Sequence, residues 1–166
     1  MPAYLIVVIA VAAILVLSSV LNWLSYRVLK NRIIRRRRWG LNICCGKTDG
    51  GGVNADIVRH SDVPRFVLIE DINRLPFRDG AFESVLSSHT IEHVDDPAGF
   101  FRELNRVGHE VTLILPPLWD FSAAFNVLEH KWLFLTFRKK HTRLPRHVRL
   151  PLAAAIQKRF GQRIKA

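Results

Sequence analysis

Residues 71–107 read DINRLPFRDGAFESVLSSHTIEHVDDPAGFFRELNRV and combine a turn, a strand and a helix in close succession. After the turn at Leu75–Gly80, the run Ala81–Ser88 predicts a strand. The segment Asp95–Gly108 predicts a helix, because an aspartate can cap its start and a proline suits its first turn. This helix would bury the apolar residues that recur at helical spacing, namely Phe100, Phe101, Leu104 and Val107.

Short apolar runs on both sides of this stretch predict four more strands, at Leu41–Cys44, Val53–Ile57, Arg65–Asp71 and His109–Pro117. Strands that alternate with helical segments indicate a parallel sheet of the α/β class. A glycine-rich loop, CGKTDGGG, joins the first two predicted strands, and the second carries Asp56 near its end. Such a loop and acid are typical of nucleotide sites, although here the acid comes early and the glycines do not follow the usual pattern.

Taken in order and spacing, LNICCG, VNADI, the stretch from Glu70 to Val107 and VTLILPP resemble S-adenosylmethionine-dependent methyltransferases with a Rossmann-like fold. The similarity is to the small-molecule branch that includes ubiquinone-pathway enzymes, and it extends from Leu41 to about Pro117. It implies an α/β domain with a shortened parallel-type sheet and flanking helices, with S-adenosylmethionine as cofactor.

The resemblance also implies a role for individual residues. Asp56 would hold the ribose hydroxyls, since a carboxylate can accept two hydrogen bonds from a diol. Asp71 would lie by the adenine amino group, with Ile72 against the ring, while Ser88 and His89 would border the methionine part. The implied cofactor-binding residues are Cys44, Cys45, Gly46, Asp56, Asp71, Ile72, Ser88 and His89.

Two departures from the family pattern favour a second hypothesis. Cys44 stands where the family's loop usually has its first glycine, and a side chain there could crowd the turn. Beyond Pro117 no clear sixth and seventh strands follow, although residues 131–137 could supply one strand or dip into a membrane interface. The alternative is a non-catalytic, membrane-tethered Rossmann-like module that binds a nucleotide or a partner protein.

Candidate catalytic residues are His89, Glu92 and His130, although methyl transfer depends mainly on alignment and does not require a dedicated base. His89–His93 also matches H-x-x-E-H, a zinc signature of some metalloproteases that requires a helix. Here the motif follows a strand directly, and a third ligand would have to be Glu103 or Glu129. A zinc hydrolase using His89, Glu92 and His93 is therefore the third hypothesis, and we predict no metal site.

The first 26 residues form a separate unit. From Pro2 to Tyr26 there is no charged residue, and a helix of this length would span roughly 35 Å, sufficient for a bilayer. Basic residues follow this run instead of preceding it, which favours an uncleaved anchor over a signal peptide. Because basic flanks stay inside, we expect the N-terminus outside and the C-terminal domain in the cytoplasm.

The net charge of +11 is unevenly distributed. Residues 27–40 carry seven Lys or Arg and residues 131–166 carry eleven, both without acids, whereas the intervening segment is net negative. Basic flanks beside an anchor favour anionic membrane lipids over nucleic acid as partners.

The acceptor would then be a small molecule or a lipid near the bilayer. We divide the chain into an anchor (1–26), a basic linker (27–40), a methyltransferase-like domain (41–130) and a basic C-terminal segment (131–166). In the last, Leu152, Ile156, Phe160 and Ile164 predict an amphipathic helix that lies on the membrane or packs on the sheet.

Overall fold

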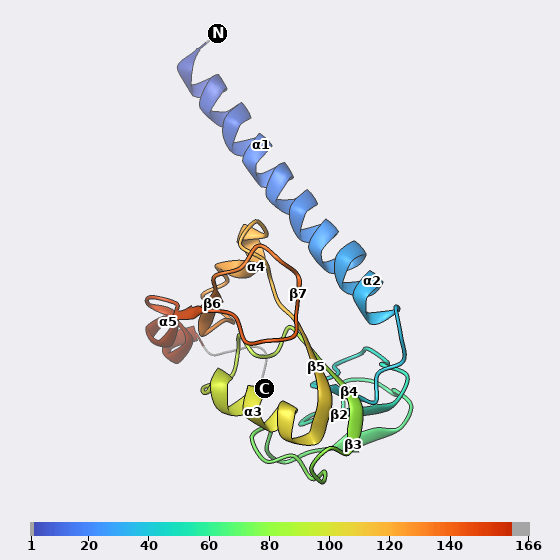
Figure 1. Cartoon of the computed structure of the whole chain (residues 1–166). Helices are drawn as coiled ribbons and strands as arrows, with labels where there is room; N and C mark the ends of the chain where they lie inside the picture. The colour runs from blue at the N-terminus through green and yellow to red at the C-terminus, as the bar shows by residue number, and fades with distance from the viewer. Residues whose placement is uncertain (1, 161–166) are drawn as a thin grey trace.

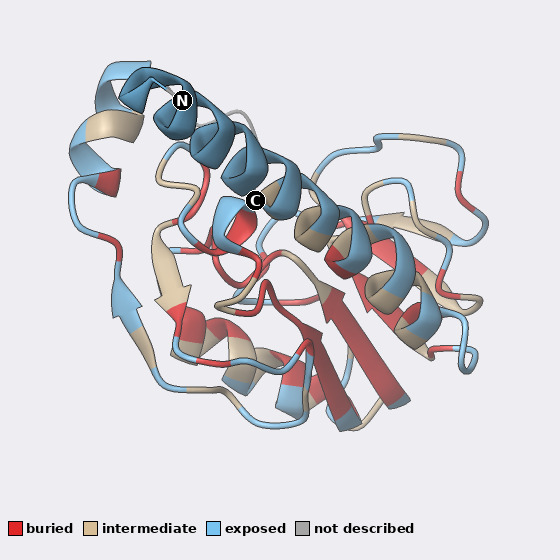
Figure 2. Ribbon diagram, turned by 90° about the horizontal axis from the view of Figure 1, so that it is seen from above, coloured by how far each residue is buried: buried red, intermediate tan, exposed pale blue. Residues whose placement is uncertain are grey.

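The computed structural model describes residues 2–160 and begins with one long helix that projects from an α/β domain (Figure 1). The helix consists of α1 (Ala3–Trp23), a π-helical segment η1 (Leu24–Lys30) and α2 (Asn31–Ile34). No residue of α1 is buried, and most of its length is pale blue in Figure 2, with some tan residues of intermediate exposure. The continuous helix Ala3–Ile34 has 32 residues, and its apolar part is compatible by length and composition with a membrane span and with a signal sequence.

The domain is built on a six-stranded sheet with the order β3-β2-β1-β4-β5-β7. Its strands are β1 (Leu41–Ile43), β2 (Val53–Asp56), β3 (Phe66–Leu68), β4 (Phe82–Ser88), β5 (Gly108–Ile114) and β7 (Lys140–His141). The first five pair in parallel, and β7 pairs antiparallel with β5. The predicted α/β class and the five predicted strands are confirmed.

The helix α3 (Pro97–Val107) packs on β4 and β5, as its sequence pattern predicts. Asp96 caps it by accepting a hydrogen bond from the Gly99 backbone N–H at 2.9 Å. Phe100, Leu104 and Val107 are fully buried against the central strands. Burial of this apolar face is a main contribution to the core, which Figure 2 shows in red along the central strands.

The segment after β5 differs from the prediction. The sheet gains a sixth strand, β7, which the sequence does not indicate because it is only two polar residues long. Residues 131–137 do contain a strand, β6 (Trp132–Phe134), but it pairs with β8 (His147–Arg149) in a separate two-stranded sheet. A short helix, α4 (Phe121–Ala124), contacts α1.

The predicted C-terminal helix is present as α5 (Ala153–Phe160). Leu152 and Phe160 are mostly exposed, whereas Ala153 is buried. Ile164, the last apolar residue of the predicted stripe, lies outside the described residues.

Candidate functional site

A cavity of about 370 Å³ lies at the carboxyl ends of β1, β2 and β4, the edge where open parallel sheets bind ligands. Six of the predicted cofactor residues line it, because each follows or ends one of these strands. They are Cys44, Cys45, Gly46, Asp56, Ser88 and His89. The structure therefore brings together around one cavity residues that are up to 45 positions apart in sequence.

Asp56 is only 4% exposed, and its carboxylate faces the loop after β1. One oxygen accepts a hydrogen bond from the backbone N–H of Gly46 at 2.8 Å, and the other accepts from that of Ile57 at 2.8 Å. Each carboxylate oxygen has two acceptor sites, so this side chain can still accept hydrogen bonds from a diol.

The loop after β1 turns through the left-handed region at two positions, Cys44 with φ 50° and Gly46 with φ 55°. A glycine adopts this conformation without strain, whereas a cysteine does so at a cost of about 1 kcal/mol. The substitution at Cys44 is thus accommodated without opening the turn. Burial raises the pKa of both adjacent thiols, that of Cys45 to about 11, so neither is a ready nucleophile near neutral pH.

A second cavity of about 190 Å³ adjoins the first, since His93 lines both. The two remaining predicted cofactor residues, Asp71 and Ile72, line this second cavity. Asp71 is exposed and Ile72 is buried, an arrangement in which the carboxylate is open to a ligand while the apolar side chain supports the cavity wall.

His89 connects the cavity to the N-terminal helix. Its ring stacks on Tyr26 with centroids 4.3 Å apart, and the Tyr26 hydroxyl lies 3.1 Å from Nδ1. Nδ1 also lies 3.1 Å from a Glu92 carboxylate oxygen, and Nε2 lies 2.8 Å from Nζ of Lys139. These partners fit a tautomer in which Nδ1–H donates to Glu92 and Nε2 accepts from the Lys139 ammonium.

The pKa values of this network follow from its burial. Burial lowers the pKa of His89 to about 4, so the imidazole is neutral near pH 7. Burial also lowers the pKa of Lys139 to about 8, although nearby Asp120 and Glu92 oppose this. Burial is the largest single effect on Glu92 and opposes its ionisation, but the hydrogen bond from His89 and the electrostatic effects of His89, His130 and His93 together place the Glu92 pKa below its ordinary value.

Sequence reasoning missed Tyr26, Lys30 and Lys139 as site residues. Tyr26 and Lys30 line the cavity from η1, and the Lys139 ammonium donates to the Ser25 hydroxyl at 2.7 Å. The charge-free run that ends at Tyr26 has no local feature that predicts contact with the sheet. Its contacts are with residues far along the chain, His89 after β4 and Lys139 after β5.

The three candidate catalytic residues occupy different positions. His89 lines the cavity with both ring nitrogens engaged, and His130 also lines it. Glu92 is fully buried behind the lining.

The segment His89–His93 forms a turn, so the helix that a metalloprotease motif requires is absent there. Of the two acids considered as a third zinc ligand, Glu103 is occupied by Arg106 and by the backbone N–H of Leu75.

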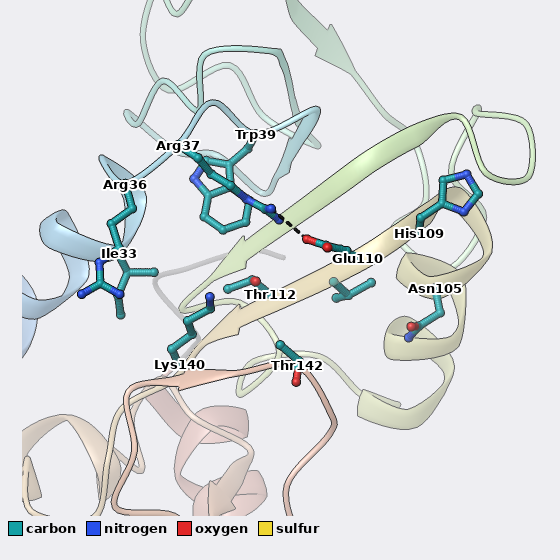
Figure 3. Close-up of a pocket in the computed structure, with 11 residues that line it drawn as sticks. Ile33, Arg36, Arg37, Trp39, Asn105, His109, Glu110, Thr112, Lys140 and Thr142 are labelled. Carbon is teal, nitrogen blue, oxygen red and sulfur yellow. Dashed lines mark ion pairs between the residues drawn. The ribbon is translucent and has the colours of Figure 1, made fainter.

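Another cavity, of about 530 Å³, lies over Trp39 and the first half of β5 (Figure 3). Figure 3 shows Arg36, Arg37 and Lys140 around it, with Arg37 in an ion pair with Glu110 at 2.8 Å. None of the predicted site residues lines this cavity.

Comparison with known proteins finds a match to one protein family over part of the chain. Residues 50–111 match the family described as methyltransferase domain. No curated protein matches the sequence.

Similar solved structures include two S-adenosylmethionine-dependent methyltransferases. One, from Thermotoga maritima, is 19% identical with a TM-score of 0.43, and the match covers 57% of this chain and 55% of that one. The other, from Aquifex aeolicus, is 17% identical with a TM-score of 0.39 and coverages of 56% and 66%. The chain thus spans about half the length of the Thermotoga structure.

The family match begins in the loop before β2 and ends within β5, so it covers β2, β3, β4, α3 and the first half of β5 but not β1. The strands on which it falls are those whose carboxyl ends carry Asp56 and His89. Residues 50–111 are therefore similar to the methyltransferase domain family, and they lie within a parallel sheet whose strand order is β3-β2-β1-β4-β5.

Proposed function

We propose that the chain is an S-adenosylmethionine-dependent methyltransferase that acts on a small-molecule or lipidic acceptor at a membrane surface. The observation that carries the proposal is the buried Asp56 carboxylate, held by the Gly46 N–H at the edge of the cavity. A buried carboxylate with spare acceptor capacity suits a ribose diol, and Asp71 and Ile72 in the adjoining cavity suit an adenine ring.

The cofactor, when bound, supplies a methyl group on a positively charged sulfur. The residues of this chain would contribute mainly position, because transfer requires the acceptor atom, the methyl carbon and the sulfur to be aligned. Asp56 and Asp71 would fix the nucleoside, and the Ser88–His89 turn would border the methionine part. Tyr26 stacked on His89 narrows the cavity on the side of the N-terminal helix.

The proposal that the enzyme acts at a membrane surface rests on the N-terminal helix. Tyr26 and Lys30, which line the cavity, follow the apolar α1 directly. Beside α1, α4 and the loops near it expose three aromatic side chains, Phe121, Phe125 and Phe137, with exposed fractions of 59%, 48% and 71%. Apolar rings next to an apolar helix suit a lipid interface, so an acceptor dissolved in the bilayer would reach the cavity beside η1.

Calorimetric titration of the detergent-solubilised protein with S-adenosylmethionine and with its demethylated product tests the cofactor. We expect saturable binding of one molecule per chain for both. Absence of binding by a folded sample would contradict the methyltransferase proposal. Binding without any transfer of labelled methyl to membrane extracts would instead favour the non-catalytic module.

The orientation can be tested by labelling engineered cysteines, because the native thiols have raised pKa values and react slowly. A cysteine replacing Asp62, whose side chain is 98% exposed, should be protected from an impermeant reagent in intact cells and labelled after permeabilisation. A cysteine replacing Pro2 should be labelled in intact cells. The reverse pattern would place the domain outside.

Anionic lipids are the partners that we propose for the basic flanks. Arg36 and Arg37 lie within three residues of the end of α2 and line, with Lys140, the cavity of Figure 3. A lipid phosphate is a suitable ligand for this basic cavity beside the end of a membrane span. The exposed Leu152 and Phe160 of the C-terminal segment would add an apolar contact with the bilayer.

Native mass spectrometry of delipidated protein tests this partner. Phosphatidylglycerol should be retained more than phosphatidylcholine, and the double substitution Arg36→Gln and Arg37→Gln should remove most of that preference. The matched control, Arg59→Gln with Arg102→Gln, removes two exposed arginines outside the cavity and should leave the preference intact. Equal loss in both double variants would indicate non-specific charge attraction.

A further inference from the structure

Three buried side chains meet beside the cavity from two distant segments of the chain. Glu92 and His93 lie in the turn after β4, and His130 lies 37 residues later than His93. One potential ligand atom of each lies within 4.8 Å of the others. The exposed fractions are 0%, 4% and 3%, so all three side chains are removed from bulk water.

The hydrogen bonds of these side chains leave their ligand atoms available. Oε2 of Glu92 and Nδ1 of His130 are buried and have no hydrogen-bond partner within residues 2–160. Nδ1 of His93 lies 2.9 Å from the Glu129 carbonyl oxygen, so it carries the hydrogen and donates, which leaves the Nε2 lone pair free. A histidine held by a backbone carbonyl in this way is the arrangement typical of metal ligands.

Leaving a carboxylate oxygen and an imidazole nitrogen buried without partners is destabilising, because neither atom recovers the hydrogen bonds that it makes with water. A divalent cation bound between these atoms would give both of them a partner at once.

The backbone holds the three side chains in place. The N–H groups of Lys131 and Trp132 both donate to the Glu92 carbonyl, at 2.8 and 3.2 Å. The Trp132 indole N–H donates to the Val94 carbonyl at 2.9 Å. These bonds join the turn after β4 to the segment that carries His130, so the cluster does not depend on side-chain packing alone.

We propose that Glu92, His93 and His130 bind one divalent transition-metal ion, such as Zn²⁺ or Mn²⁺. One carboxylate and two imidazoles suit these ions, and three protein ligands leave at least one coordination position open. Because His93 and His130 line the cavity, the open position faces it. His89, whose Nδ1–H donates to the other Glu92 oxygen, orients that carboxylate.

At its open position the ion would bind an oxygen atom of the acceptor. This use of the ion rests on the proposed methyltransferase function. The metal site itself does not rest on that function. The proposed ligand set also differs from that of the metalloprotease hypothesis. His89 is not a ligand here, because its Nε2 contacts Lys139, and His130 is the third ligand instead.

Chelator-treated protein in detergent, titrated with Zn²⁺ or Mn²⁺ alone, tests the site. Calorimetry and elemental analysis should find one ion per chain. The variants Glu92→Gln and His130→Ala should each weaken binding at least tenfold, while His109→Ala, which removes an exposed histidine beside the cavity of Figure 3, should not. Substoichiometric binding by the folded wild-type protein, or equal affinity in all three variants, would overturn the proposal.

A second measurement covers variants that fail to fold and the competing thiols of Cys44 and Cys45. The wild-type protein loaded with Co²⁺ should show visible bands of nitrogen and oxygen ligands without an intense thiolate charge-transfer band. A thiolate band would assign the metal to the cysteines and overturn the proposal. Titration of the same samples with S-adenosylmethionine separates the metal proposal from the methyltransferase proposal. A protein that binds the cofactor but no metal ion would contradict only the metal proposal.

Discussion

Replacing Asp56 with alanine is expected to weaken S-adenosylmethionine binding by about 1.5 to 3 kcal/mol, the usual scale for hydrogen bonds to a charged group. This corresponds to a rise in Kd of roughly 10- to 150-fold. The carboxylate would lose its bonds to the ribose, and the Gly46 N–H would lose its acceptor, so the loop after β1 would be less well held. Calorimetric titration of the variant in detergent measures the change.

Glu70→Ala is the matched control, because Glu70 is an exposed acid at the end of the next strand and lines the adjoining cavity. It should change cofactor affinity far less than Asp56→Ala. If Glu70 were the sensitive position and Asp56 were not, the cofactor would lie one strand further along the sheet than proposed.

Replacing Phe100 with alanine is expected to lower the free energy of unfolding by about 3 to 5 kcal/mol. The Phe100 ring is fully buried between α3 and the sheet, and its removal would leave a cavity in the main core. Unfolding by urea in mild detergent, followed by tryptophan fluorescence, measures the loss.

Phe121→Ala removes a ring of the same size that is 59% exposed on α4. This control should change the free energy of unfolding by less than about 0.5 kcal/mol. Similar losses in both variants would indicate that α3 is not the helix that anchors the core.

The parts of the fold that the sequence predicts are those specified by local pattern. The strands around Asn42, Asn54 and Ser84 and the helix capped by Asp96 each have apolar spacing, turn residues or a cap within a short window. The parallel order then follows from the alternation of strands with a helix, and parallel order places Asp56 and His89 at one edge.

The remainder depends on contacts between distant residues. Tyr26 meets His89 across 63 positions, and Lys139 meets it across 50. His130 lies beside Glu92 and His93 where Lys131 and Trp132 bond to the Glu92 carbonyl and His93 bonds to the Glu129 carbonyl. A lone histidine or lysine in a basic segment has no local pattern that indicates such a partner, so these residues could be found only in three dimensions.

The short axial distance between the apolar helix and the cavity wall affects how the proposed enzyme would find its substrate. Tyr26 follows Trp23, the last residue of α1, by three residues, which is about 4.5 Å along a helix axis. In the proposed orientation the cavity is therefore held at one depth, just below the head groups. A lipid acceptor would reach it by lateral diffusion in two dimensions, whereas a water-soluble competitor would have to search in three.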